Sequence, residues 1–332
     1  MNWPKKEVAA VTGANGFVGS HMVDYLLDKG LHVKSIVRKT SNLRWLEKKD
    51  TELCTCGLMD VDALRTVFQD ADYIFHIAGT TKTKTLDGFM QGNVSLTRNV
   101  LEAARGLDNI RKIVVTSSIA AVGPMPAGEI MDEKKELLPI DPYGKSKAAQ
   151  EKLCSEYMNC LPISIVRPPV VYGERDVEVY RYFQTVNSRL RPLVGLWGKK
   201  ELSMIYVVNL VEGLYLAAIK EVAKGQTYFF TDPTHYDWAQ IGRVATRLLN
   251  KKSLPLRIPH FLVYSIAGMS QVYSKITGRA TLFNLDKARQ MVAASWMCTS
   301  GKARRELNYN GAIGLEEGFK NTIDWYKERK WL

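Results

Sequence analysis

The sequence has few cysteines and lacks a long apolar run. Its five cysteines among 332 residues fit neither a disulfide framework nor a zinc-ligand spacing, so we expect reduced thiols and no metal site. The first residues lead into a strand-like run with no signal peptide, which predicts a cytoplasmic protein. The most apolar later segment, residues 258–273, is too short and too polar to span a bilayer. We expect an amphipathic helix there that covers a pocket, with peripheral contact to a membrane surface as the open alternative.

Acidic residues are also in deficit. Lys and Arg number 46 against 34 Asp and Glu, which gives a formal net charge of +12. This excess favours an anionic ligand or an acidic surface as partner, although a solvated basic surface has the same composition. The basic residues are scattered and no nucleic-acid-binding module is present, so nucleic acid is not an expected partner.

Up to about residue 170, short β-branched runs alternate with segments of helical periodicity. The strand-like runs include "EVAAVTG", "HVKSIVR", "YIFHIAG", "KIVVTSS" and "ISIVRPP". Such alternation is typical of βαβ units and predicts an α/β fold with a doubly wound parallel sheet. After Tyr172 the runs "LSMIYVV" and "QTYFFT" fall among helical segments, which predicts a smaller mixed domain.

Three glycines, Gly13, Gly16 and Gly19, lie between the first strand-like run and a helical segment. The turn therefore lies at a helix N-terminus, where free N–H groups and the helix dipole favour an anion. Gly13 can adopt turn dihedrals, Gly16 lets a pyrophosphate approach, and Gly19 lets the helix pack against the sheet. The stretch predicts a dinucleotide-binding turn, whose other residues are Asn15, Phe17 and Val18.

The end of the second strand bears on the choice of dinucleotide. Dinucleotide folds place an acidic residue there to bind a ribose 2′-hydroxyl, or a basic one for a 2′-phosphate. This chain has Val37 followed by Arg38 and Lys39. A guanidinium holds a phosphate through two parallel hydrogen bonds. We therefore expect NADP(H) as the preferred cofactor, with Arg38 as the main contact, Lys39 as a secondary one, and NAD(H) as the alternative.

Tyr143 and Lys147 lie four residues apart at the start of a helical segment, so their side chains share a face. A neighbouring ammonium lowers the pKa of a phenol toward the range in which it transfers protons. Tyr143 can then move the proton of an alcohol or carbonyl while hydride passes at a nicotinamide ring. Upstream, "KIVVTSS" ends with Thr116, Ser117 and Ser118 at the sheet edge where ligands of open α/β sheets bind.

In combination, these motifs resemble those of the extended short-chain dehydrogenase/reductases. "TGANGFVG" is similar to the family's TGxxGFxG, "FHIAG" to FHxAA, "GNVSLTRNVLEAA" to NVxGTxNVLEAA and "IVRPPVVYG" to xxRPxxVYG. "MIYVVNLVEGLYLAA" is similar to FIHVDDVAxAxxLA, with Asn209 in place of a usual Asp. The resemblance covers essentially the whole chain. It implies a Rossmann domain mainly within residues 1–172 and a smaller substrate domain mainly within 173–332, with residues 200–220 returning to the first.

The resemblance also assigns roles to single residues. It implies that Ser118 hydrogen-bonds the reacting oxygen, that Lys147 holds the ribose hydroxyls and that Asn93 supports the site. Where the family reads adenine with an Asp, "CGLMDVDAL" has Gly57 and then Leu58, so we expect backbone contacts there or, less readily, a contact from Asp60. The other implied cofactor contacts are Ala78, Gly79, Thr116, Pro168, Pro169, Val170 and Val171.

Three functional interpretations follow. "VRKTSN" and the apolar segment 258–273 are most similar to the dihydroflavonol reductase and 3β-hydroxysteroid dehydrogenase branch, which implies NADP(H)-dependent interconversion of a ketone and a secondary alcohol on a hydrophobic or aromatic substrate. The second is an NDP-sugar epimerase or dehydratase with bound NAD. The third is a non-catalytic nucleotide-sensing protein, against which the retained Ser, Tyr and Lys count.

The substrate pocket is the least defined part of the prediction. We expect residues 80–85, the segment after Ser118, Tyr180, Trp197 and residues 258–273 to line it. A homodimer through two long helices is usual in the family and is expected here.

Overall fold

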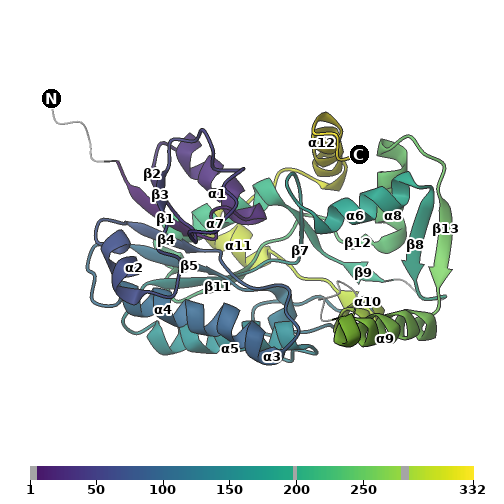
Figure 1. Ribbon diagram of the computed structural model, residues 1–332, viewed down its shortest axis with the longest axis horizontal. Helices are drawn as coiled ribbons and strands as arrows, with labels where there is room; N and C mark the ends of the chain where they lie inside the picture. Colours follow the sequence, from purple (N-terminus) through teal and green to yellow (C-terminus); the bar gives the residue numbers. More distant parts are fainter. Residues whose placement is uncertain (1–5, 197–199, 278–283) are drawn as a thin grey trace.

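A seven-stranded parallel sheet forms the centre of the larger part of the molecule (Figure 1). The computed structural model describes residues 6–196, 200–277 and 284–332. The strand order is β11-β6-β5-β4-β1-β2-β3, and every neighbouring pair runs parallel. The bounds are β1 Val8–Thr12, β2 His32–Ile36, β3 Glu52–Cys54, β4 Tyr73–His76, β5 Lys112–Thr116, β6 Ile163–Arg167 and β11 Thr227–Phe229. The predicted α/β fold is confirmed.

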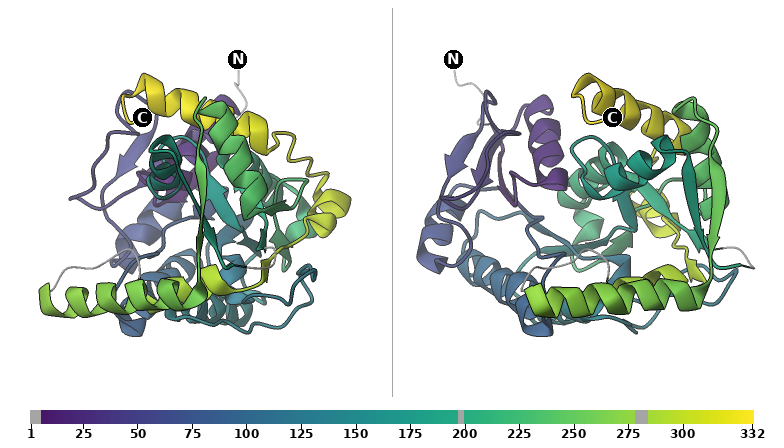
Figure 2. Two further views of the ribbon diagram at one scale, coloured as in Figure 1. Left: turned by 90° about the vertical axis from the view of Figure 1, so that its right-hand side faces the viewer. Right: turned by 45° about the vertical axis from the view of Figure 1, so that its right-hand side comes forward.

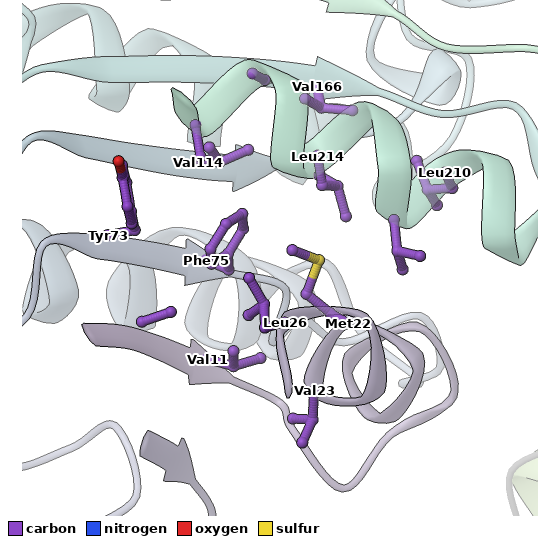
Figure 3. Packing of buried hydrophobic residues seen from close by; sticks show 14 of the residues in the cluster. Val11, Met22, Val23, Leu26, Tyr73, Phe75, Val114, Val166, Leu210 and Leu214 are labelled. Atoms are coloured by element: carbon purple, nitrogen blue, oxygen red, sulfur yellow. The ribbon is translucent and has the colours of Figure 1, made fainter. Parts of the chain in front are cut away.

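Helices cover both faces of this sheet. One face carries α1 (Phe17–Asp28), α7 (Val207–Ile219) and α11 (Gly301–Leu307), and the other carries α2 (Val61–Phe68), α4 (Leu96–Ala104) and α5 (Pro142–Tyr157). Successive side chains of β1 alternate between the two cores: Ala9 and Val11 pack with Met22 of α1 (Figure 3), and Val8 and Ala10 pack on the opposite side. Burial on both faces explains why the central strands read as continuous apolar runs.

A smaller mixed region follows β6 in the chain. Its strands are β7 (Val170–Tyr172), β8 (Leu190–Val194), β9 (Glu201–Leu202), β10 (Met204–Tyr206), β12 (Tyr236–Asp237), β13 (Leu254–Ile258) and β14 (Ser295–Trp296). Its helices are α6 (Glu178–Asn187), α8 (Trp238–Leu248), α9 (His260–Thr277), α10 (Leu285–Val292) and α12 (Leu315–Glu328). An aromatic core that includes Phe183, Phe319 and Tyr326 holds α6 and α12 together. The strands form three small sheets instead of one layer.

Two strands of the large sheet differ from the sequence prediction. "QTYFFT" was expected in the smaller domain, but β11 pairs with β6 at the edge of the large sheet. The edge strand β3 has three residues within "TELCTCG", too few to show a period. Because α7 and β11 both pack with the large sheet, the chain returns to it after β10. The division at residue 172 stays a prediction.

Asn209, in α7, is buried against a carboxylate. Its Nδ2 donates to Oδ1 of Asp232 at 2.9 Å and to the Ile313 carbonyl at 2.7 Å. The same Asp232 oxygen accepts from the Tyr206 N–H, and burial raises the Asp232 pKa to about 6. An aspartate at 209 would place a second carboxylate against the first. The amide therefore suits this environment.

Replacing Asn209 with Asp should lower the free energy of unfolding by about 3 kcal/mol at about pH 8, because two carboxylates then share a buried site and the Ile313 carbonyl loses its donor. Raised pKa values mean that the folded state binds protons more tightly than the unfolded state. The reduction in the free energy of unfolding should therefore become smaller as the pH falls through about 6 toward about 4. Thermal denaturation of both proteins across this pH range measures that reduction. Asn209→Ala, which adds no charge, should show a weaker pH dependence; equal dependence in both variants would contradict the argument.

Candidate active site

The glycine turn joins β1 to α1 as the sequence predicts. Gly13 has φ +68°, and a Cβ on it would lie 2.9 Å from the Ala78 backbone. Gly16 is the N-cap of α1, its N–H donates to the Gly13 carbonyl at 2.9 Å, and no side chain caps the helix. The sequence analysis expected Gly19 to let the helix pack against the sheet. A Cβ on Gly19 would instead overlap the Gly13 carbonyl oxygen, so Gly19 packs on the turn itself.

This turn fits the pyrophosphate of a dinucleotide. The first N–H groups of α1 have no intrahelical acceptor, and the first turn of the helix contains no acidic residue. Phe17 and Val18 supply N–H groups of this first turn, and Asn15 lies before them with its Nδ2 3.4 Å from the Asn42 carbonyl. Uncapped amides at the positive end of a helix dipole attract an anion.

Arg38 and Lys39 follow β2 at the surface. Both side chains are exposed, and within residues 6–196, 200–277 and 284–332 neither forms an ion pair. The Arg38 N–H donates to Oγ of Ser41 at 3.1 Å, which fixes the backbone of the loop. A free guanidinium at this strand end fits a 2′-phosphate.

The segment at the predicted adenine site is held close to Arg38. Gly57 has φ +68° and its N–H donates to the Val37 carbonyl at 3.0 Å, while a Cβ on it would lie 3.6 Å from Arg38 Cγ. Leu58 is buried and its carbonyl accepts from Asn99. Asp60, the alternative adenine contact, caps α2 through a bond from the Ala63 N–H. Its carboxylate therefore already has a structural role.

Ser118 and Tyr143 meet at the carboxyl edge of the sheet. Ser118 follows β5, its Oγ accepts from the Ala120 N–H at 3.1 Å, and its hydroxyl lies close enough to the Tyr143 phenol to lower the pKa of that phenol. Tyr143 lies in the first turn of α5, where Asp141 accepts from the Gly144 N–H at 2.8 Å and Pro142 occupies the first helical position. A Cβ on Gly144 would overlap the Ala120 carbonyl oxygen, so this glycine permits α5 to approach the serine. The sequence analysis did not single out Gly144.

Lys147 is buried one turn further along α5. Its Nζ donates to the Thr116 carbonyl at 2.9 Å and to Oε1 of Gln150 at 3.0 Å, which leaves one of its three N–H donors for a ligand such as a ribose hydroxyl. Burial lowers its pKa to about 8, and the Glu151 carboxylate opposes that shift. The contact to Thr116 is through the backbone. Among the described residues, none accepts a hydrogen bond from the buried Thr116 hydroxyl.

The pKa of Tyr143 differs from the sequence expectation. Burial raises it to about 12, the hydrogen bond from Ser118 opposes the rise, and the negative charges of Asp141 and Glu178 add to it. Lys147 is not among the groups that shift this pKa, so the expected lowering by its ammonium is not found and desolvation dominates. A phenol with a pKa of about 12 stays protonated at neutral pH.

Asn93 braces the site from a π-helical turn, η1 (Met90–Ser95). Its Oδ1 accepts from the Thr80 N–H at 2.7 Å, and its Nδ2 donates to the Thr80 carbonyl at 3.0 Å and to Ser146 Oγ at 2.9 Å. A Cβ on Gly79 would lie 2.9 Å from Asn93 Oδ1 and 3.4 Å from Lys147 Nζ. Asn93 therefore ties the loop after β4 to α5, which is a positioning role.

A buried chain of hydrogen bonds connects the glycine turn to Lys147. Thr12 Oγ1 lies 2.8 Å from His76 Nδ1, and His76 Nε2 lies 2.8 Å from Thr97 Oγ1. Gln150 donates to Thr97 Oγ1 at 2.7 Å and accepts from Lys147. Burial lowers the His76 pKa to about 3, so the imidazole is neutral. The sequence analysis missed His76, Thr97 and Gln150; the one signal was a histidine closing an apolar strand.

The chain after β6 lies beside Ser118. The Ile119 N–H donates to the Pro168 carbonyl at 3.0 Å, and Val170 is exposed at the start of β7. Of the implied cofactor contacts in this segment, Pro168 is thereby tied to the residue after Ser118, and Val170 and Val171 lie in β7. Beneath them Arg167 and Glu151 form a buried ion pair at 2.6 Å, which anchors the segment to α5.

The residues predicted to line the substrate pocket lie in different surroundings. Lys82, in the segment 80–85, pairs with Glu178 of α6 at 2.8 Å, and the Phe89 ring lies 5.9 Å from the Tyr143 ring. Tyr180 instead donates to the Trp331 carbonyl and packs on aromatic rings of the C-terminal segment. Trp197 lies outside the described residues. Helix α9 within 258–277 exposes most of its apolar side chains, which is contrary to the expected pocket cover.

The chain is similar to known proteins over most of its length. Residues 9–229 match the NAD dependent epimerase/dehydratase family. The chain is 28% identical over 326 residues to a ceramide reductase of Caulobacter vibrioides, with 98% of this chain and 96% of the relative covered. It is 26% identical to a 3 beta-hydroxysteroid dehydrogenase/Delta 5-->4-isomerase of Mycobacterium tuberculosis, with 95% and 89% covered.

A solved structure shows the same fold. The UDP-glucuronic acid 4-epimerase of Bacillus cereus in complex with NAD superimposes with a TM-score of 0.78 at 21% identity, and the match covers 97% of this chain and 99% of that one. The fold is therefore common to reductases and sugar epimerases, and the residues of the site have to distinguish between them.

Proposed function

This chain belongs to the NAD-dependent epimerase/dehydratase family, and on that premise we propose that it is an NADP(H)-dependent oxidoreductase that interconverts a ketone and a secondary alcohol on a hydrophobic or aromatic substrate. The observation that carries the proposal is that the Ser118 and Tyr143 hydroxyls lie together at the carboxyl edge of the sheet, with Lys147 on the same helix as the tyrosine. Two hydroxyls at one point can both bond a single carbonyl oxygen, which is what polarisation followed by protonation requires.

Ser118, Tyr143 and Lys147 have separate roles in a reduction. When bound, the nicotinamide cofactor supplies the hydride. Ser118 donates to the substrate carbonyl oxygen and orients it, while Tyr143 gives up its phenolic proton as negative charge develops there. A pKa of about 12 keeps Tyr143 protonated at neutral pH, which is the form that reduction needs. Lys147 would hold ribose hydroxyls with the donor that its bonds to Thr116 and Gln150 leave available.

Arg38 supports NADP(H) over NAD(H). The strand end that would carry a carboxylate for a 2′-hydroxyl has Val37 and Arg38, and the guanidinium has no ion-pair partner among the described residues. An enzyme that takes a fresh reduced cofactor in each turnover gains from this selectivity, whereas an epimerase regenerates the cofactor that it holds. Two of the relatives support an apolar substrate, since their names refer to a ceramide and a steroid.

The second candidate is an NDP-sugar epimerase, which the solved epimerase of the same fold favours. A dehydratase would in addition want an acidic side chain just after the serine, where this chain has the buried apolar residues Ile119 and Ala120.

Loss of nicotinamide absorbance tests the proposal. Purified protein is mixed with NADPH or NADH and a panel of apolar ketones in detergent micelles, and separately with UDP-sugars. We expect net NADPH consumption with at least one ketone, a preference for NADPH over NADH of about tenfold or more, and no epimerisation. Epimerisation of a UDP-sugar by protein that carries NAD through purification would reject the reductase in favour of the second candidate.

A further inference from the structure

Helix α9 turns an apolar face away from the protein. Val263 and Ala267 are buried and pack with Val194 and Ala288. The exposed apolar residues, which we call the α9 face, are Phe261, Leu262, Tyr264, Ile266, Met269, Val272, Tyr273 and Ile276. Surface helices of globular proteins normally show the opposite pattern, with the wide apolar stripe inward.

The α9 face is continuous. Leu262, Ile266, Met269, Tyr273 and Ile276 follow one another at steps of four, three, four and three residues, which places them in one stripe along the helix. Met269 is 65% and Ile276 80% exposed. Both views in Figure 2 place α9 along the outer edge of the molecule. Contiguous exposed apolar surface of this kind marks an interaction site.

The sequence of α9 and its flanks is basic. Helix α9 contains no acidic residue, and the basic residues within it or beside it in the sequence are Arg257, Lys275 and Arg279. Arg257, at the end of β13 that leads into α9, is exposed (Figure 1). An apolar helix face accompanied by lysine and arginine matches an anionic lipid surface, to which each nearby basic residue adds attraction.

We propose that the α9 face docks on the surface of an anionic lipid bilayer, with the helix lying in the headgroup region. Among the described residues no helix is long and apolar enough to cross a membrane. The excess positive charge argues against a second copy of the chain as occupant, because self-association would bring two basic segments together. An anionic bilayer supplies both the apolar depth and the opposite charge.

The docking surface is joined to the catalytic helix. Helix α9 packs on α10, and Gln290 of α10 donates to Oδ2 of Asp141 at 2.7 Å. The other carboxylate oxygen of Asp141 accepts from the Gly144 N–H and so caps α5, two residues before Tyr143 in the sequence. Docking through the α9 face would therefore hold the start of α5 near the lipid. The binding itself does not depend on the proposed reaction.

Vesicle flotation with the full chain tests the docking. The probes are vesicles of phosphatidylcholine with phosphatidylglycerol, and vesicles of phosphatidylcholine alone. The chain should bind the mixed vesicles and bind the neutral ones at least about tenfold more weakly. Met269→Ser with Ile276→Ser should weaken binding to the mixed vesicles by about tenfold or more, because two side chains lose their burial in lipid. Both side chains are exposed, so the fold should be retained, which circular dichroism checks.

The matched control changes two exposed apolar residues elsewhere, Leu53→Ser in β3 and Val222→Ser beside α7. It should bind the mixed vesicles as the unaltered chain does. Arg257→Glu, at the end of β13 that leads into α9, should reduce binding to the mixed vesicles, whereas Lys251→Glu with Lys252→Glu, at the opposite end of that strand, should not. Equal binding by the α9 variant and the control would overturn the proposal. A dimer in analytical ultracentrifugation that the α9 substitutions convert to monomer, without vesicle binding, would overturn it in favour of an interface between copies.

Discussion

Replacing Tyr143 with phenylalanine should lower kcat/KM for ketone reduction by about 10³-fold, which is the scale of a positioned general acid. The substitution removes one oxygen and with it the proton that must reach the developing alkoxide. Ser118 keeps its own hydroxyl and Lys147 keeps its bonds to Thr116 and Gln150, so the affinity for NADPH should stay close to that of the unaltered chain. Steady-state rates and a fluorescence titration with NADPH measure the two effects separately.

Tyr157 provides the matched control, since it is a buried tyrosine at the other end of the same helix. Its phenol donates to the Glu102 carboxylate of α4. Tyr157→Phe should retain most of the activity. If Tyr143→Phe retained a tenth or more of the activity, some other group would be the proton donor.

Replacing Arg38 with alanine should weaken NADPH binding by about 10- to 100-fold and leave NADH binding nearly unchanged, because charge-assisted bonds to a phosphate contribute about 1.5–3 kcal/mol. The guanidinium is exposed and lies outside the packed core, so the fold should not be affected. Isothermal titration with each dinucleotide measures the ratio of the two affinities.

Lys39→Ala is the comparison for Arg38→Ala. It should reduce the NADPH affinity by a smaller factor, because an ammonium makes no bidentate bond. Equal losses for NADPH and NADH in the Arg38 variant would mean that the guanidinium does not read the 2′-phosphate, and the reductase proposal would then lose its main support from the cofactor site.

Local patterns were sufficient to predict the parallel sheet, the glycine turn and the placement of Tyr143 and Lys147 on one helix, whereas the role of Ser118 was inferred from the family resemblance. Each depends on short-range regularities: strand and helix periods, a turn that requires Gly13 at positive φ, and an i,i+4 pair on one helix. Strand β11 was misassigned because its pairing with β6 joins segments far apart in the chain. The edge strand β3 has too few residues for any pattern.

The features of the site that the sequence analysis missed depend on tertiary burial. The raised pKa of Tyr143 follows from desolvation by its neighbours. The Phe89 ring lies against the tyrosine ring, and Gly144 lets α5 pack closely on the segment after Ser118. The chain from His76 through Thr97 to Gln150 joins three elements and has no fixed spacing. Periodicity likewise finds an apolar stripe in α9 but cannot tell which side faces outward.

Transfer of deuteride from labelled NADPH tests the central claim most directly. The protein is incubated with a ketone that it reduces and with NADPH deuterated at the transferring position of the nicotinamide, and the alcohol is analysed by mass spectrometry. The account predicts one deuterium at the carbinol carbon for each NADPH oxidised, and loss of this product in Tyr143→Phe. Alcohol without deuterium, or turnover with no oxidation of NADPH, would contradict it.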